Sequence, residues 1–186
     1  MTEKSQIAAA ELGSAGGAAP VAQDRPDKRR TPPANGRATN FVLMPADFVP
    51  PFEAVTAVAT VAFTEDGLIV AAEENRGPDL PGGHVMEGEE SAEETARRES
   101  QEETGVKLGV VHFLRAIQSD RYGSAPEDLT YMVIMAALVV EQGPVPAGMK
   151  KHVMTVEQFF AAHRGLRQEM VRSLVLEAQQ LLFAAP

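Results

Sequence analysis

The segment "GGHVMEGEESAEETARRESQEETGV" (82–106) restricts the fold of this chain more than any other stretch. It contains eight Glu but only two arginines. Ser91, with Glu94 three residues later, has the sequence pattern of a capping box, and Gly105 stands where a left-handed helix cap belongs. The pattern predicts a helix from Ser91 to Gly105.

Three carboxylates are expected on one face of this helix. Glu99, Glu102 and Glu103 fall at i, i+3 and i+4 and span about 140° of its surface. Neighbours at these spacings lie roughly 5–6 Å apart, so their oxygens can converge on one point. The helix dipole disfavours acids in the last turn, and a divalent cation such as Mg²⁺, which prefers oxygen ligands, would offset that penalty. The alternative is a solvated acidic face with Arg97 and Arg98 as counterions.

The flanking segments predict a sheet. "VTAVATVAF" (55–63) and "LIVAA" (68–72) form a predicted β-hairpin around an Asp-Gly turn. "ENRGPDLPGG" (74–83) is rich in Gly and Pro and is expected to be a loop. Two further strands are expected at 109–117 and 129–140, the second buried on both faces because it is continuously apolar.

Two helices are expected near the C-terminus, at 155–163, beginning at Thr155, and at 165–183. In the second, apolar residues recur at helical spacing and predict a packing surface: Leu166, Met170, Leu174, Ala178 and Leu181. A mixed sheet with helices on its faces follows, which is an α/β (α+β) fold.

Composition limits the remaining choices. A net charge of −9 makes long nucleic acid an unlikely partner, and a chain without Cys favours a reducing, cytoplasmic location. The longest apolar run, Met132–Val140, is too short to span a membrane. Residues 1–40 contain nine Ala, four Gly and four Pro, and we expect a disordered tail there, with the folded domain at 41–186.

Within the acidic segment, "RESQEETGV" (98–106) resembles the second half of the Nudix hydrolase signature. That signature reads Gly, five residues, Glu, seven residues, Arg-Glu, an apolar residue, any residue, Glu-Glu, any residue, Gly and an apolar residue. "LPGG" (80–83) is similar to the family's usual lead-in. Ser100 departs from the pattern, because it occupies a position that is usually apolar; we expect its hydroxyl to bond the carbonyl of Ala96.

The first half of the signature fits less well. With seven residues between it and Arg98, the first glutamate would be Glu90, and six residues instead of five then separate it from Gly83. We expect the extra residue to bulge the loop, which leaves open whether Glu89 or Glu90 fills the first glutamate position.

The resemblance implies a Nudix-type α/β/α sandwich that hydrolyses a phosphoanhydride bond in a nucleoside diphosphate linked to another moiety. It implies Glu99 and Glu103 as the main ligands of Mg²⁺ or Mn²⁺, with Glu102 as a further ligand or supporting acid. The backbone carbonyl of Gly83 would be another ligand, and Arg98 would orient the carboxylates. A metal would lower the pKa of a bound water and neutralise charge on the leaving phosphate.

Other roles are less defined by the resemblance. Glu99 is the first choice for the general base, and a distal acid, Glu127 or Glu141, is the alternative. Scattered basic residues are candidates for substrate contact: Arg76, His84, Arg115, Arg121, Lys150, Lys151 and His152. A solvated basic turn is the simpler interpretation of the last three. For His84 and the three arginines, the alternative is an ordinary solvated residue.

Two functions therefore remain open. The first is a Nudix pyrophosphohydrolase acting on a small nucleoside diphosphate derivative, with a homodimer suggested by family habit alone. The second is a Nudix-fold nucleotide-binding or regulatory module with weak or no turnover. The sequence does not identify the nucleotide derivative.

Overall fold

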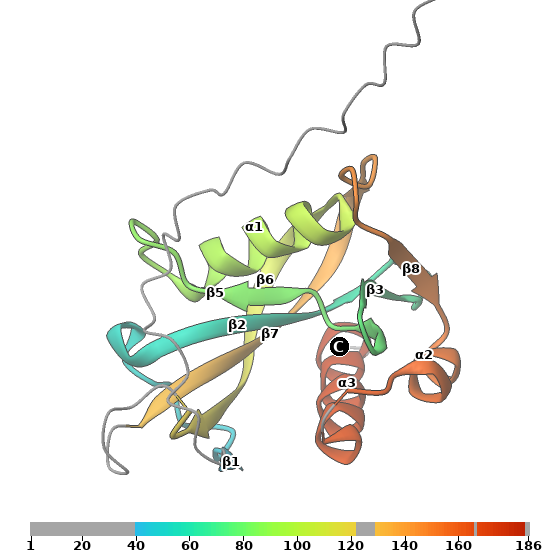
Figure 1. The fold of residues 1–186 in the computed structure, drawn as a ribbon. Coiled ribbons are helices and arrows are strands. Elements are labelled where there is room, and N and C mark those ends of the chain that lie inside the picture. Colours follow the sequence, from blue (N-terminus) through green and yellow to red (C-terminus); the bar gives the residue numbers. More distant parts are fainter. Residues whose placement is uncertain (1–39, 122–128, 166, 185–186) are drawn as a thin grey trace, which may run out of the picture.

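The protein folds as a mixed sheet between helices, as seen in the computed structural model, which describes residues 40–121, 129–165 and 167–184. Figure 1 shows α1 (Ala92–Thr104) on one side of the sheet, with α2 (Val156–Ala162) and α3 (Gln168–Phe183) on the other. The predicted α/β/α sandwich is confirmed. The predicted tail lies outside the described residues apart from Asn40.

The sheet has eight strands in the order β1-β6-β7-β2-β3-β4, with β5 beside β2 and β8 beside β3. The β2–β7 pair is parallel and the other pairs are antiparallel. A short 3-10 helix, Phe52–Ala54, precedes β2. The strands are β1 (Phe41–Leu43), β2 (Val55–Phe63), β3 (Ile69–Glu74), β4 (Gly77–Asp79), β5 (Gly82–His84), β6 (Val106–Ser119), β7 (Thr130–Gln142) and β8 (Lys151–Met154).

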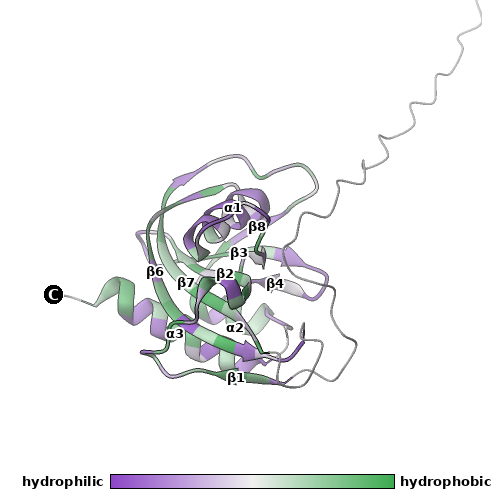
Figure 2. Ribbon diagram, turned by 90° about the vertical axis from the view of Figure 1, so that its left-hand side faces the viewer, coloured by the Kyte–Doolittle hydropathy of each residue, from purple (hydrophilic) through white to green (hydrophobic). Residues whose placement is uncertain are grey.

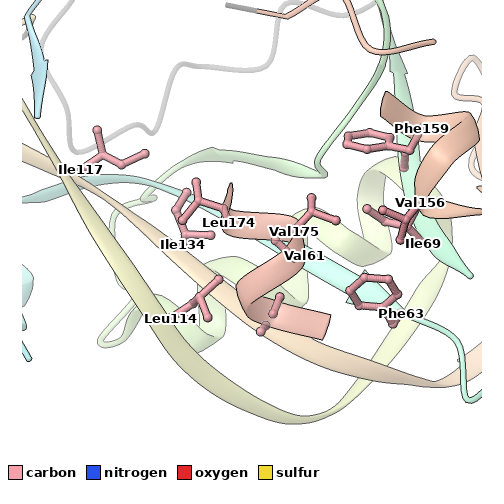
Figure 3. Close-up of a cluster of buried hydrophobic side chains, with 13 residues drawn as sticks. Val61, Phe63, Ile69, Leu114, Ile117, Ile134, Val156, Phe159, Leu174 and Val175 are labelled. Atoms are coloured by element: carbon pink, nitrogen blue, oxygen red, sulfur yellow. The ribbon is translucent and has the colours of Figure 1, made fainter. Parts of the chain in front are cut away.

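Apolar side chains cover both faces of the sheet. Figure 3 shows Leu174 and Val175 of α3 packed toward Val61, Leu114 and Ile134 on one face. On the other face, Val85 and Ala96 belong to a second buried cluster with residues of β2, β6 and β7. The centre of β7 is buried on both faces, as its unbroken apolarity predicts. Along the described residues, no helix is long and apolar enough to cross a membrane.

The long elements agree with the sequence and the short edge strands do not. The hairpin of β2 and β3 and both C-terminal helices are confirmed, although α3 begins at Gln168. The predicted loop 74–83 is wrong in part, because β4 folds back on β3 and β5 pairs with β2. The basic turn suggested for Lys150, Lys151 and His152 is wrong for the last two, since β8 begins at Lys151 and pairs with β3. β1 was not predicted.

The apolar stripe of α3 is only partly buried. Leu174 and Ala178 are buried and Met170 packs against the same cluster, whereas Leu181 is 48% exposed. Leu182 packs against the cluster instead. Successive residues of a helix point about 100° apart, so Leu181 and Leu182 cannot both face the sheet. Leu166 lies outside the described residues.

Candidate functional site

The acidic helix begins and ends at the capping residues that the sequence predicts. Ser91 is the N-cap of α1 and its hydroxyl accepts a hydrogen bond from the N–H of Glu94. Gly105 ends the helix with a left-handed conformation, φ 70°. The capping box is incomplete, because the Glu94 carboxylate accepts from the N–H of Glu90 and not from that of Ser91.

Apolar packing does not explain this helix. Figure 2 shows α1 coloured mostly as hydrophilic. Its buried residues are a single Ala, three hydroxyl-bearing residues and one carboxylate, in order Thr95, Ala96, Glu99, Ser100 and Thr104. Burying hydroxyls and a charge contributes little hydrophobic free energy and costs desolvation. The buried carboxylate therefore needs a reason other than core formation.

The double glycine brings β5 against two of the helix carboxylates. The N–H of Gly82 donates to Glu103 Oε2 at 2.9 Å. A Cβ added to Gly83 would lie 2.2 Å from Glu99 Oε1, so any larger residue would displace that carboxylate from its present position. A Cβ on Gly82 would meet the carbonyl of Val58 at 2.4 Å, since β5 pairs closely with β2.

The two carboxylates are held in a protonation-prone environment. Burial raises the pKa of Glu103 to about 7; the Gly82 N–H opposes this, while Glu99, Glu74 and Asp79 add to it. Burial also raises the pKa of Glu99, although the neighbouring Arg98 acts against that rise. Both carboxylates would be stabilised by a nearby positive charge.

Arg98 connects four groups of the site. Its guanidinium bonds Glu89 at 2.7 Å, Glu99 at 2.6 Å and Glu102 at 3.2 Å, and it donates to the carbonyl of His84 at 2.9 Å. Burial alone would lower the pKa of Arg98, but its bonds to Glu89 and Glu99 raise it further above its ordinary value. Arg98 is therefore a fixed cation that holds the acids in place.

The structure places Glu89, and not Glu90, in this network. The Glu89 carboxylate accepts from Met86 N–H and Thr95 Oγ1 as well as from Arg98. Burial would raise the pKa of Glu89, but these hydrogen bonds outweigh it and lower the pKa. Glu90 is exposed. The extra residue therefore falls after Glu89, just before α1, and not between Gly83 and the glutamate.

Ser100 differs from the prediction. Its Oγ is buried and has no hydrogen-bond partner in the described structure, so the expected bond to Ala96 is wrong. The carbonyl of Ser100 instead accepts from Thr104 Oγ1 at 2.6 Å.

The three helix carboxylates do not converge in this arrangement. Glu99 and Glu103 face β5, while the Glu102 side chain is 57% exposed and pairs with Arg98. In the described ranges, no three His, Cys, Asp or Glu side chains are grouped closely enough to hold a metal ion. The donor chemistry still fits a hard cation. Glu99 and Glu103 have raised pKa values, and among the described residues Glu99 accepts hydrogen bonds from Arg98 alone and Glu103 from Gly82 alone. Their carboxylate oxygens therefore keep acceptor capacity for a metal ion.

A cleft of about 480 Å³ opens beside these glycines. Its floor is apolar and comes from the central strands, including Ala57, Ala59, Ile117, Met132 and Ile134. Side chains of α3 form one wall, and Phe41 of β1 also lines the cleft. The cleft therefore joins the glycine strand on one side of the molecule to the α3 face on the other.

The candidate substrate residues divide into two groups. Arg76, His84 and Arg121 line the cleft. The others do not line it, and several have partners elsewhere: Arg115 bonds Glu177, Lys151 bonds Gln142, and Lys150 and His152 pair with Glu73. Glu141, a candidate distal acid, is exposed and pairs with Lys107. Glu127 lies outside the described residues.

Four polar or aromatic residues of the cleft were not predicted from the sequence. Glu74 and Asp79 lie close enough to Glu103 to raise its pKa, but they fall in the segment 74–83 that reads as a loop. Phe41 and Arg167 meet only through the fold, and no local pattern connects them.

Fold and site together define a class: an α/β/α protein whose acidic helix meets a double-glycine strand at the end of a cleft. Residues 33–174 match the sequence model of the NUDIX domain. The match covers well over half of the chain, and the chain belongs to the Nudix family. A search of curated protein sequences finds no match.

Solved structures share the fold at low sequence identity. A mutant of the Bacillus subtilis pyrophosphohydrolase BsRppH matches at 21% identity and TM-score 0.61, over 80% of this chain and 94% of its own. The NUDIX domain of Shewanella oneidensis NrtR, complexed with ADP ribose, matches at 18% identity and TM-score 0.53, over 69% and 88%. MutT, from a study of Aliivibrio salmonicida and Vibrio cholerae, matches at 18% and TM-score 0.50, over 64% and 94%.

Proposed function

We propose that this protein is a metal-dependent pyrophosphohydrolase that cleaves a phosphoanhydride bond in a nucleoside diphosphate linked to another moiety. One observation carries the proposal. Two carboxylates with raised pKa, Glu99 and Glu103, face the glycines that line the end of the cleft. A diphosphate entering that end would be repelled unless a cation joined it to the carboxylates.

Nudix hydrolases generally use divalent metals, and the residues here suit Mg²⁺ or Mn²⁺. Glu99 and Glu103 would supply the main oxygens, Glu102 a further one after leaving Arg98, and Gly83 its carbonyl. Such an ion lowers the pKa of a bound water and neutralises charge that develops on the leaving phosphate.

The chain's own residues have distinct tasks in this proposal. Arg98 and Glu89 orient Glu99 through paired charge-assisted hydrogen bonds. Glu99 is the first candidate to take the proton of the attacking water, because burial already raises its proton affinity. Arg76, His84 and Arg121 are candidates to contact phosphate or the linked group, since all three line the cleft.

The names of the structural neighbours support this substrate class. One is a pyrophosphohydrolase, and another was crystallised with ADP ribose, which is a nucleoside diphosphate joined to a sugar. These names apply to those proteins, and they set the first compounds to test on this one.

The test is a panel of nucleoside diphosphate derivatives with Mg²⁺ or Mn²⁺, in which phosphate is measured after phosphatase treatment. We expect turnover of at least one compound, its loss with a chelator, and a fall of a hundredfold or more in Glu103→Gln. Glu65→Gln, an exposed residue of the β2–β3 turn, is the control with the same change in charge. Full activity in Glu103→Gln would refute the assigned ligand.

A nucleotide-binding module is the second candidate. The observation that favours it is that the described carboxylates are not gathered into a metal-binding group, with Glu99 and Glu102 both paired to Arg98. No turnover of any compound, together with nucleotide binding that is unaffected by chelator, would select the module over the enzyme.

A further inference from the structure

His163 is the one buried histidine among the described residues, at 3% exposure. It follows α2 as the C-cap of that helix, apart from the acidic helix and the glycine strand, and the proposed function gives it no task. Its ring stacks on Phe159, a core residue labelled in Figure 3, with the ring centroids 5.3 Å apart. This packing fixes the position of the ring.

The ring has one hydrogen bond and one nitrogen without a partner. Nδ1 of His163 lies 3.0 Å from the carbonyl oxygen of Pro78, and because a carbonyl only accepts, Nδ1 carries the proton and donates. Nε2 is buried and has no hydrogen-bond partner in the described part of the chain. A buried polar atom without a partner costs free energy, so core formation alone would favour an apolar side chain here.

The contact between α2 and β4 is close because two glycines leave room for it. A Cβ on Gly77 would meet the carbonyl oxygen of Ala162 at 3.1 Å. A Cβ on Gly165 would lie 2.2 Å from His163 Cε1 and 3.0 Å from Asp79 Oδ2. Nδ1 of His163 itself lies 3.6 Å from Asp79 Oδ1. The end of α2 therefore contacts both the backbone and the carboxylate of β4.

β4 depends on such outside contacts. It is a three-residue strand at the edge of the sheet, and Pro78 at its centre has no N–H to donate. Four residues later, the N–H of Gly82 donates to the Glu103 carboxylate. Pro78 and Pro81 each fix a φ angle in this short run, so few torsions remain to absorb a movement before it reaches Gly82.

We propose that His163 is a positioning residue, which through its bond to Pro78 sets where Asp79 and the Gly82 N–H lie and thereby holds Glu103 in place for a cation. The last of these steps rests on the proposed function. His163 does not line the cleft, and it contacts no substrate in this scheme. Asp79 does line the cleft, so its placement also sets the charge there.

The first experiment observes the Gly82 amide in the metal-free protein. Proton–nitrogen correlation NMR in EDTA compares the wild type with His163→Leu, which has no donor, and His163→Asn, whose side-chain NH₂ can donate near the position of Nδ1. A hydrogen bond to a carboxylate deshields an amide proton. We therefore expect the Gly82 signal to move upfield in His163→Leu and to return toward its wild-type position in His163→Asn.

The second experiment measures Mg²⁺ binding by titration calorimetry. Loss of a group that orients a metal ligand typically weakens metal binding tenfold or more, so we expect about a tenfold loss in His163→Leu and its recovery in His163→Asn. Val175→Ala is the structural control, because Val175 is fully buried in the cluster that contains Phe159 and does not line the cleft. It should lower the melting temperature and leave the Mg²⁺ affinity unchanged.

A second variant tests the same link without changing the histidine. Gly165→Ala should push the His163 ring away from Pro78, and we expect it to shift the Gly82 signal and weaken Mg²⁺ binding in the same direction as His163→Leu. An unchanged Gly82 signal in His163→Leu, or in Gly165→Ala should His163→Leu fail to fold, would overturn the proposal. So would a His163→Asn protein as impaired as His163→Leu.

Hydrolysis then separates this proposal from the function on which it rests. The same kcat and the same Mg²⁺ requirement in His163→Leu and the wild type would leave the enzyme intact and refute the positioning role. A Gly82 signal that depends on the His163 donor, in a protein that hydrolyses no compound of the panel, would support the positioning role and refute the enzyme. If the wild type bound no Mg²⁺, the assigned ligands would be wrong, and the Gly82 signal alone would decide whether His163 places this segment.

Discussion

Replacing Glu103 by Gln should stabilise the metal-free protein at alkaline pH. Gln has nearly the same shape as Glu, and its side-chain oxygen can still accept the hydrogen bond from Gly82 N–H. It carries no charge, so it avoids the desolvation and the repulsion from Glu99, Glu74 and Asp79 that raise the pKa of Glu103. The substitution should therefore remove activity and increase stability together.

The sign follows from proton linkage. The pKa of Glu103 is about 7 in the folded protein against an ordinary value of 4.5, so the folded state binds more protons between those two values. Its contribution to the free energy of unfolding is fully present below pH 4.5 and is lost as the pH rises through about 7. At pH 8 the wild type bears the whole penalty, and Gln removes it.

The full pKa shift would correspond to about 3 kcal/mol. Glu103 is only half-buried, and solvent screening reduces the expected effect to about 1–2 kcal/mol. For a domain of this size, that is a rise in melting temperature of roughly 3–8 °C.

The assay is thermal unfolding in EDTA at pH 5 and pH 8, followed by circular dichroism, for the wild type, Glu103→Gln and the control Glu65→Gln. We expect the gain at pH 8 in Glu103→Gln alone and a much smaller difference at pH 5. Added Mg²⁺ should raise the melting temperature of the wild type at pH 8 and leave that of Glu103→Gln nearly unchanged. A Glu103→Gln protein no more stable than the wild type at pH 8 would refute the reasoning.

Three further substitutions test the site. Gly83→Ala should displace the Glu99 carboxylate, because its Cβ would lie 2.2 Å from Oε1; turnover and Mg²⁺ binding by calorimetry should both fall more than tenfold, and unchanged values would contradict this. Arg98→Ala should cost about 2–4 kcal/mol in urea unfolding by leaving Glu89 and Glu99 without their cation, and a cost below 1 kcal/mol would count against it. Ser100→Ala should stabilise by about 0.5–1 kcal/mol, because it removes a buried, unbonded hydroxyl; a loss of stability would show that the hydroxyl has a partner.

The acidic helix could be predicted because its information is local. Ser91 caps the first turn of α1 and Gly105 caps its last turn, so each acts on backbone groups next to it in the chain. The carboxylates likewise follow one another at fixed spacing along the same helix. The edge strands could not be predicted in this way. β4, β5 and β8 each have three or four residues, and they are strands only because β3 or β2 offers them backbone partners from elsewhere in the chain.

The site shows the same division. Counting along the signature left Glu89 and Glu90 equivalent, because spacing does not tell where a loop absorbs an extra residue. The fold decides between them through Arg98, nearly two turns into α1, whose guanidinium reaches Glu89. Arg167 and Phe41 are 126 positions apart in the chain and come together only when β1 and α3 pack on the same face.

The two glycines explain how a helix on one face of the sheet can serve a cleft that opens toward the other. α1 packs with Val85 and Ala96 in one core cluster, while α3 packs in the other. A side chain at Gly83 would occupy the space beside the Glu99 carboxylate, because its Cβ would lie 2.2 Å from Oε1. Glu103 accepts a hydrogen bond from the backbone N–H of Gly82, which itself lines the cleft. In the proposed function, the double glycine would let Glu99 and Glu103 lie close to a cation and to the diphosphate of the substrate.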